Sequence, residues 1–74
     1  MSSVFNYLIV DQFLAHDLKL DKFRNILEIP ERYKGLRATL LVNEPDKLEL
    51  GDVLYSIKPD GSLEIIRNNY DTSD

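Results

Sequence analysis

A β-hairpin is predicted by the stretch Val53-Leu-Tyr-Ser-Ile-Lys-Pro-Asp-Gly-Ser-Leu-Glu-Ile-Ile-Arg67. Two runs rich in β-branched and aromatic residues flank the segment Pro59-Asp-Gly61. Pro59 presets the backbone of a type I turn, and Gly61 tolerates the left-handed conformation that follows. The sequence therefore indicates antiparallel strands at 52–58 and 62–68.

The loop also predicts the register of the hairpin. Ile57 is expected opposite Leu63, Tyr55 opposite Ile65, and Val53 opposite Arg67. One face is then apolar, and its side chains are those of Val53, Tyr55, Ile57, Leu63 and Ile65. A register shifted by one residue would mix polar and apolar side chains on that face, so the pattern favours a single register.

The N-terminal part is predicted to be helical, with a strand as the alternative for residues 4–10. Residues 3–15 and 18–28 repeat apolar side chains at helical spacing, and these are Phe5, Leu8, Ile9, Phe13, Leu20, Phe23, Ile26 and Leu27. Strand-forming residues are also common between 4 and 10, which leaves a buried strand open there. The second helix must end before Pro30, because proline clashes with the preceding helical turn.

A third strand is predicted at 36–43, where apolar side chains recur at every second position. Residues 30–35 are typical of a turn before it, and Glu44-Pro45-Asp46 ends it. The predicted fold class is α+β, with one or two N-terminal helices packed on a three-stranded antiparallel β-meander. We expect a single domain at 1–67, followed by a polar tail at 68–74 that frays.

The face of the meander that lies away from the helices also carries apolar side chains. These are Leu41, Leu54 and Ile66, and the last two are expected to pair across the hairpin. An apolar patch on the outer face of a sheet favours contact with another protein or with a second copy of the chain. We therefore predict a partner-binding surface at these residues or at the open edge of the sheet, with a homodimer as one form of it.

Composition and charge indicate a small acidic protein whose charge is unevenly distributed. The 74 residues include no cysteine, so neither a disulfide framework nor a thiolate metal site can form. The net charge of −4 divides into −2 for residues 1–18, +3 for 19–37 and −5 for 38–74. No apolar run approaches the roughly 20 residues of a membrane span, and the first residues lack the basic start of a signal peptide. We expect a cytoplasmic protein without membrane contact.

The residues that could carry chemistry are few and scattered. His16 is the only histidine, and it is expected to face solvent at a helix end. Asp46, Glu49 and Asp52 lie around a glycine but lack the spacing of a calcium loop. No serine has a partnered-histidine motif, and no glycine-rich phosphate loop is present. We therefore predict no enzymatic activity, no metal and no cofactor.

The middle of the chain is the segment best suited to meet a phosphate backbone or an acidic protein. Its bases are Lys19, Lys22, Arg24, Arg32, Lys34 and Arg37, with Phe23 and Tyr33 between them. Nucleic-acid binding would require these bases to share one face, and an isoelectric point near 4.8 opposes non-specific binding. The alternative is that segment 19–37 is an ordinary solvated surface.

Two segments within about residues 48–67 resemble the hairpin half of AbrB/MazE-type antitoxins and transition-state regulators. They are Leu50-Gly-Asp-Val-Leu-Tyr55 and Asp60-Gly-Ser-Leu-Glu-Ile65, in which a Gly-Asp entry leads into two strands joined around an Asp-Gly turn. Ile29-Pro30, followed by Tyr33 and Gly35, is similar to openings of small toxin–antitoxin proteins. The resemblance implies a swapped-hairpin dimer that contacts DNA. The Ile-Pro pair lies farther from the Gly-Asp pair here than it does in that family.

The leading functional hypothesis is a non-enzymatic, small acidic binding protein that acts through a protein partner, as an inhibitor, an antitoxin-like protein or an adaptor. It is based on the small size, the acidity and the two apolar faces of the predicted sheet. The alternative is an AbrB-like dimeric DNA-binding transcriptional regulator or antitoxin that uses segment 19–37. Only the alternative predicts a salt-dependent affinity for duplex DNA.

Overall fold

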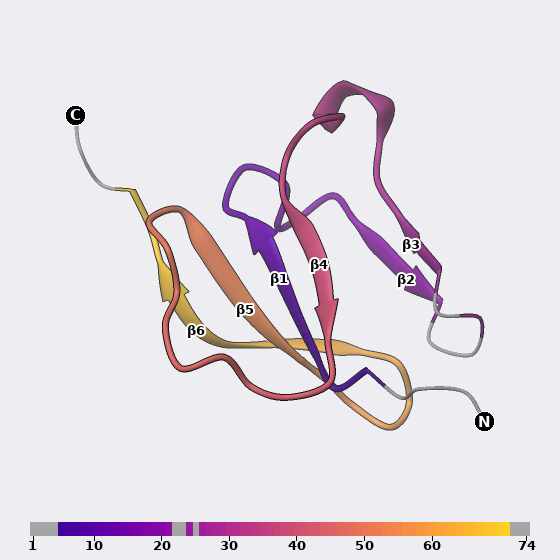
Figure 1. The fold of residues 1–74 in the computed structure, drawn as a ribbon. Helices are drawn as coiled ribbons and strands as arrows, with labels where there is room; N and C mark the ends of the chain where they lie inside the picture. The colour runs from indigo at the N-terminus through magenta and orange to yellow at the C-terminus, as the bar shows by residue number, and fades with distance from the viewer. Residues whose placement is uncertain (1–4, 22–23, 25, 72–74) are drawn as a thin grey trace.

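The computed structural model describes residues 5–21, 24 and 26–71. In this part it contains one turn of 3-10 helix and six strands: β1 (Tyr7–Asp11), β2 (Lys19–Asp21), β3 (Ile26–Glu28), η1 (Glu31–Tyr33), β4 (Ala38–Leu41), β5 (Asp52–Ile57) and β6 (Leu63–Asn69). The described residues include no α-helix, and the molecule is built mainly from β-strands (Figure 1).

The predicted α+β class with N-terminal helices is wrong. The described residues of 3–15 form β1 and a series of turns, and those of 18–28 form a short hairpin of β2 and β3. Residues 3, 4, 22, 23 and 25 lie outside the described part. The alternative strand at 4–10 is confirmed by β1 for residues 7–10, while residues 5 and 6 precede the strand and residue 4 lies outside the described part. Leu8, Ile9 and Val10 are all buried in it, and a strand buried on both faces carries a continuous apolar run that also satisfies helical spacing.

The predicted three-stranded meander is also wrong, because β1 lies between β4 and β5. The main sheet has four strands in the order β4-β1-β5-β6, and each neighbouring pair is antiparallel. Leu8 of β1 lies opposite Leu40 on one side and opposite Tyr55 on the other. Since β4 and β5 both run antiparallel to β1, they run parallel to each other. The connection 42–51 must therefore cross from one end of the sheet to the other.

The β5–β6 hairpin confirms the predicted register close to its turn and departs from it farther away. Ile57 lies opposite Leu63 and Tyr55 opposite Ile65, as the loop predicts. Beyond them a β-bulge leaves Ile66 without a residue opposite it, and Arg67 then pairs with Leu54. The predicted Val53–Arg67 and Leu54–Ile66 pairs are therefore wrong.

The end of β6 differs from the predicted boundary, whereas the turn between β5 and β6 has the predicted glycine. Strand β6 extends to Asn69, so fraying does not begin at residue 68 as predicted, and residues 72–74 lie outside the described part. The turn carries its glycine as expected, because Gly61 has a φ of +91° that side-chain-bearing residues rarely adopt.

The first face of the sheet forms the main hydrophobic core under the β2–β3 hairpin. Its buried side chains are Leu8, Val10, Val53, Tyr55 and Ile57, joined by Ala15 from the turn after β1. Leu20 of β2 and Leu27 of β3 lie opposite each other and pack against this cluster. The short hairpin thus does the covering that the predicted helices were expected to do (Figure 1).

The second face of the sheet is covered by the connection 42–51, which we call the crossover. Leu54 is fully buried on this face, and Arg67 lies opposite it on β6. The Arg67 guanidinium donates a hydrogen bond to the carbonyl oxygen of Pro45, and the Asn69 side-chain amide donates one to that of Leu48 at 3.1 Å. The crossover is therefore fastened to β6. Much of the second face is covered by the chain itself.

Candidate functional site

Three segments that are distant in the sequence meet at the end of the sheet where β1 ends, β5 begins and β6 ends. The backbone N–H of Gln12 donates to the carbonyl oxygen of Gly51 at 2.8 Å, and the N–H of Gly51 donates to that of Asn69 at 2.6 Å. The side-chain oxygen of Gln12 accepts a bond from the N–H of Asp71 at 2.6 Å. These bonds fix the relative positions of residues 12, 51, 69 and 71.

A large apolar side chain is exposed beside each of the bonded segments. Phe13 is 70% exposed, Leu50 67% and Tyr70 42%. We call Phe13, Leu50 and Tyr70 the apolar corner. Single exposed apolar residues are common on soluble proteins, but three of them on segments that hydrogen bonds hold together make this end of the sheet the best candidate for a binding surface.

The turn that carries Leu50 is held by ion pairs and a hydrogen bond that centre on the buried carboxylate of Asp52 and on Arg37. The Arg37 guanidinium lies 2.9 Å from a carboxylate oxygen of Asp52 and 2.8 Å from one of Glu49. Asp52 is only 5% exposed, and its carboxylate also accepts the backbone N–H of Glu49 at 3.1 Å. Gly51 completes the turn with a φ of +92°. Leu50 is thus exposed on a turn that is fixed at both sides.

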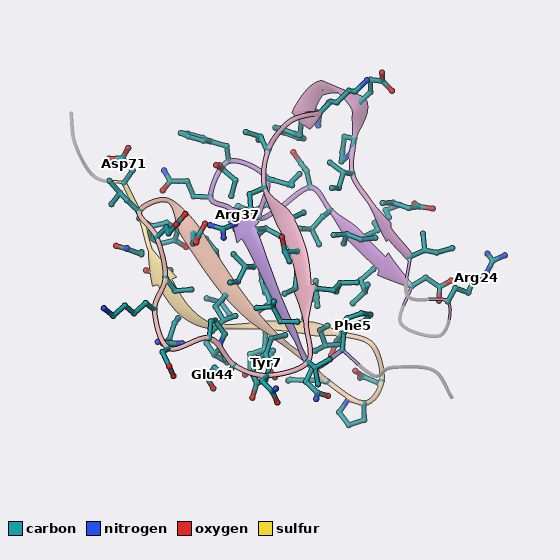
Figure 2. The ribbon with its side chains drawn as sticks, viewed as in Figure 1. Phe5, Tyr7, Arg24, Arg37, Glu44 and Asp71 are labelled. Atoms are coloured by element: carbon teal, nitrogen blue, oxygen red, sulfur yellow. The ribbon has the colours of Figure 1, made fainter. Side chains whose placement is uncertain are left out.

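The rim of the apolar corner is acidic. Asp11 accepts the backbone N–H of Phe13 at 2.9 Å, which places its carboxylate beside the corner, and Asp71 adjoins Tyr70. Glu49 adjoins Leu50, and its side chain is 81% exposed. Arg37 is a basic residue beside this acidic rim, and its guanidinium is already bound to the carboxylates of Glu49 and Asp52. Figure 2 shows Arg37 and Asp71 toward this end of the sheet, and Tyr7 and Glu44 at the other end.

The bases of segment 19–37 do not gather on one face. Arg24 lies beyond the strands of the β2–β3 hairpin, far from Arg37 at the apolar corner (Figure 2). Lys19 is on β2, Arg32 is on η1 and lies 3.4 Å from Asp17, and Lys34 follows η1. Lys22 and Phe23 lie outside the described part. The described bases are therefore interleaved with carboxylates and spread over the molecule.

Asp17 links the turn after β1 to η1. The Tyr33 hydroxyl donates a hydrogen bond to its carboxylate at 2.6 Å, and the Arg32 guanidinium lies on the same oxygen and 5.1 Å from the centroid of the Tyr33 ring. The Tyr33 hydrogen bond is the main cause that lowers the pKa of Asp17, and Arg32 adds to it. This cluster joins two segments of the fold, so we assign it a structural role.

The predicted surface of Leu41, Leu54 and Ile66 is not brought together as an exposed face. Leu54 is fully buried, Leu41 is half-buried on β4, and Ile66 is 39% exposed on β6. The crossover takes the place that a partner was expected to occupy. Ile66 instead belongs to the outer edge of the sheet, since β6 is its last strand.

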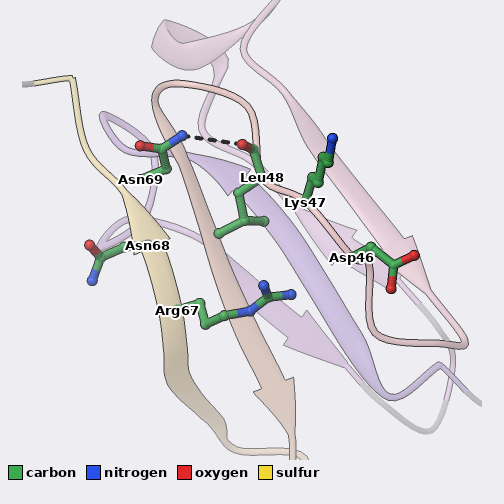
Figure 3. Close-up of a pocket in the computed structure, with 6 residues that line it drawn as sticks. All are labelled: Asp46, Lys47, Leu48, Arg67, Asn68 and Asn69. Carbon is green, nitrogen blue, oxygen red and sulfur yellow. Dashed lines mark hydrogen bonds between the residues drawn. The ribbon is translucent and has the colours of Figure 1, made fainter.

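A hollow of about 510 Å³ lies between the crossover and β6 (Figure 3). It is lined by Asp46, Lys47, Leu48, Arg67, Asn68 and Asn69. Arg67 also lies 3.3 Å from Glu44, and its buried Nε has no hydrogen-bond partner in the described part. Charges of both signs line or flank this hollow, so it selects no ligand of a single charge.

The remaining chemical groups form no metal site among the described residues. His16 is exposed, as expected, in the turn after β1 rather than at a helix end. Glu49 and Asp52 bind Arg37, while Asp46 lies at the hollow beside the crossover. Within the described ranges, no helix has the length and apolar character that crossing a bilayer requires.

The sequence alone did not identify the apolar corner. Phe13 fits the apolar stripe of the predicted helix, Leu50 belongs to a segment without a clear pattern, and Tyr70 belongs to the predicted tail. Their proximity depends on the pairing of β1 with β5, for which the sequence holds no local signal. The AbrB/MazE resemblance stays a prediction. No protein-family model, no curated protein and no solved structure matches this chain.

Proposed function

We propose that the chain is a non-enzymatic protein-binding domain that docks a protein partner on the apolar corner. The observation that carries this proposal is the exposure of Phe13, Leu50 and Tyr70 on three segments that hydrogen bonds hold together. Large apolar and aromatic side chains on a rigid frame are typical anchors of protein interfaces, because little conformational entropy is lost when they bind. An inhibitor, an antitoxin-like protein or an adaptor would act in this way.

The charges around the corner define the chemistry of the partner. Asp11, Glu49 and Asp71 form the rim, and Arg37 is engaged with Glu49 and Asp52. A complementary surface would present an apolar pocket or side chain surrounded by lysine and arginine. Rim charges mainly accelerate association, so binding should become slower as salt rises.

The test is capture of partner proteins from an extract by the immobilised full chain. Leu50→Ser is expected to abolish retention of the specific partner, because truncation of a central interface anchor commonly costs about 2 kcal/mol or more. The matched control is Ile26→Ser, which alters an apolar side chain of β3 that is 44% exposed and lies away from the corner. Urea unfolding of both variants verifies that the fold is retained.

The result separates the proposal from its alternatives. A protein retained by the wild type and by Ile26→Ser, but lost with Leu50→Ser, supports docking at the corner. Retention that is equal for all three proteins, or that is lost only with Ile26→Ser, overturns it. The captured protein is then checked for basic residues in its contact surface by charge reversal of Glu49, which should weaken binding by slowing association.

A further inference from the structure

Gln12 is hydrogen-bonded to both of the other segments that carry the apolar corner. Its backbone N–H donates to the carbonyl oxygen of Gly51 at 2.8 Å, and its side-chain oxygen accepts the N–H of Asp71 at 2.6 Å. A Cβ at Gly51 would lie 3.9 Å from this side-chain oxygen, so the Gln12 side chain runs close to the Gly51 turn. Gln12 also directly precedes Phe13. One half-buried residue thus connects the three segments.

Tyr70 is the corner residue that depends most on this contact, because it lies beyond the sheet. Strand β6 ends at Asn69, whose pair with Asp52 is the last one of the β5–β6 ladder. The end of a chain stays ordered only where contacts fasten it. The bond from the Asp71 N–H to the Gln12 side chain fastens the backbone directly after Tyr70, across 59 positions of sequence.

The Tyr70 side chain lies toward the turn that carries Phe13. Burial raises the pKa of Tyr55, and the negative charge of Tyr70 raises it further. Electrostatic effects weaken with distance, so the two phenol groups lie near each other. The Tyr55 hydroxyl is itself bonded at 2.6 Å to the carbonyl oxygen of Ala15, in the turn after β1. Tyr70 and Phe13 are therefore on the same side of this end of the sheet.

We infer that Gln12 is a positioning residue of the docking surface, whose side chain holds Tyr70 in the apolar corner and does not itself contact the partner. This inference rests on the proposed function and adds a cause of its affinity. A partner that needs all three anchors binds only molecules in which Tyr70 is in place, so the apparent affinity scales with the fraction of such molecules. A fixed anchor also loses less conformational entropy on binding than a free one.

The first test measures the hold of Gln12 on the chain end in the full chain alone. Gln12→Met keeps the length of the side chain and the backbone bond to Gly51 but removes the acceptor, whereas Gln12→Glu keeps an acceptor oxygen and is the conservative variant. Hydrogen exchange of the Asp71 amide, followed by NMR, should accelerate about fivefold in Gln12→Met and stay near the wild-type rate in Gln12→Glu. The amides of β5 and the urea midpoint should be unchanged in both variants.

The second test asks whether Gln12 acts through Tyr70. The probe is the purified protein that the wild type retains and Leu50→Ser does not, and its dissociation constant is measured by titration. Gln12→Met should weaken binding about fivefold in the wild-type background and leave it unchanged in a Tyr70→Ala background, where the anchor is already gone. Gln12→Glu should restore binding. Losses that simply add would mean that Gln12 contacts the partner itself.

The two tests separate failure of this inference from failure of the proposed function. If Gln12→Met leaves the exchange of the Asp71 amide unchanged, or if the binding losses add, the inference is overturned even where Leu50→Ser abolishes binding and the proposed function stands. If Leu50→Ser abolishes nothing, the proposed function falls. The Asp71 amide then still decides whether Gln12 holds the chain end, because that measurement needs no partner.

Discussion

The phenolic O–H of Tyr55 donates a 2.6 Å hydrogen bond to the carbonyl oxygen of Ala15, across 40 positions of sequence. Tyr55 is 6% exposed and Ala15 is 8% exposed, so the bond lies inside the core. It fixes the turn after β1 to the middle of β5. The β2–β3 hairpin begins shortly after this turn, and the bond thereby positions the layer that covers the first face of the sheet.

Tyr55→Phe should lower the free energy of unfolding by about 1–3 kcal/mol. The ring still fills the core, but the Ala15 carbonyl loses its partner, and a buried acceptor without a hydrogen bond carries a desolvation penalty. Chemical denaturation at neutral pH measures the loss. Tyr70→Phe is the control, because that ring is exposed and should leave stability almost unchanged. Equal effects of the two substitutions would show that the buried bond contributes nothing.

The free energy of unfolding should fall at alkaline pH because of Tyr55. Burial, followed by the negative charge of Tyr70, raises the pKa of Tyr55 above its ordinary value of 10.0. The folded state keeps the phenol protonated after the unfolded state has lost the proton, so stability is full below 10.0 and decreases as pH rises toward the folded pKa. Denaturation curves of wild type and Tyr55→Phe across this interval test the point. A slope that is as steep in the variant would assign it to another group.

Acid should weaken the contact between Asp17 and Tyr33. The Tyr33 hydrogen bond, with Arg32, lowers the pKa of Asp17 below 3.8, so the contribution to stability is present above 3.8 and is lost as pH falls through the folded pKa. Tyr33→Phe should therefore reduce the melting temperature at neutral pH and have a smaller effect in strong acid. Thermal unfolding at both pH values gives the comparison. A pH-independent effect would point to packing of the ring instead.

Asp52→Asn should destabilise the protein more than Glu49→Gln does. Both carboxylates bind Arg37, but the Asp52 side chain is 6% exposed and that of Glu49 is 81% exposed. Loss of a buried, charge-assisted hydrogen bond costs about 1–3 kcal/mol, whereas an exposed ion pair contributes roughly 1 kcal/mol or less. Urea unfolding of the two variants ranks them. The reverse order would mean that Arg37 is held mainly by Glu49.

The hairpin shows how far local sequence determines structure in this chain. Pro59 and Gly61 fix the turn, and the alternation beside it fixes the pairs up to Tyr55 and Ile65. The bulge that follows depends on a residue outside the hairpin. It brings Arg67 onto the face where the carbonyl of Pro45 accepts its hydrogen bond. No pattern within the hairpin contains that information.

The N-terminal half was predicted poorly for a different reason. β2 and β3 have three residues each, which is too short for a period of two to be distinguished from helical spacing at Leu20 and Leu27. β1 is apolar on both faces and shows no alternation. The apolar corner depends on where β1 is inserted in the sheet. It could not be located before the strand order was known.

The insertion of β1 between β4 and β5 has a consequence for synthesis of the chain. Leu8 finds its partners at Leu40 and Tyr55, so a nascent chain leaving the ribosome carries the central strand long before either neighbour exists. The apolar run from Tyr7 to Val10 remains unpaired during this interval and is a natural binding site for chaperones. Completion of the sheet must wait for β5, so the expected behaviour of this topology is slow folding that is limited by contacts between distant segments.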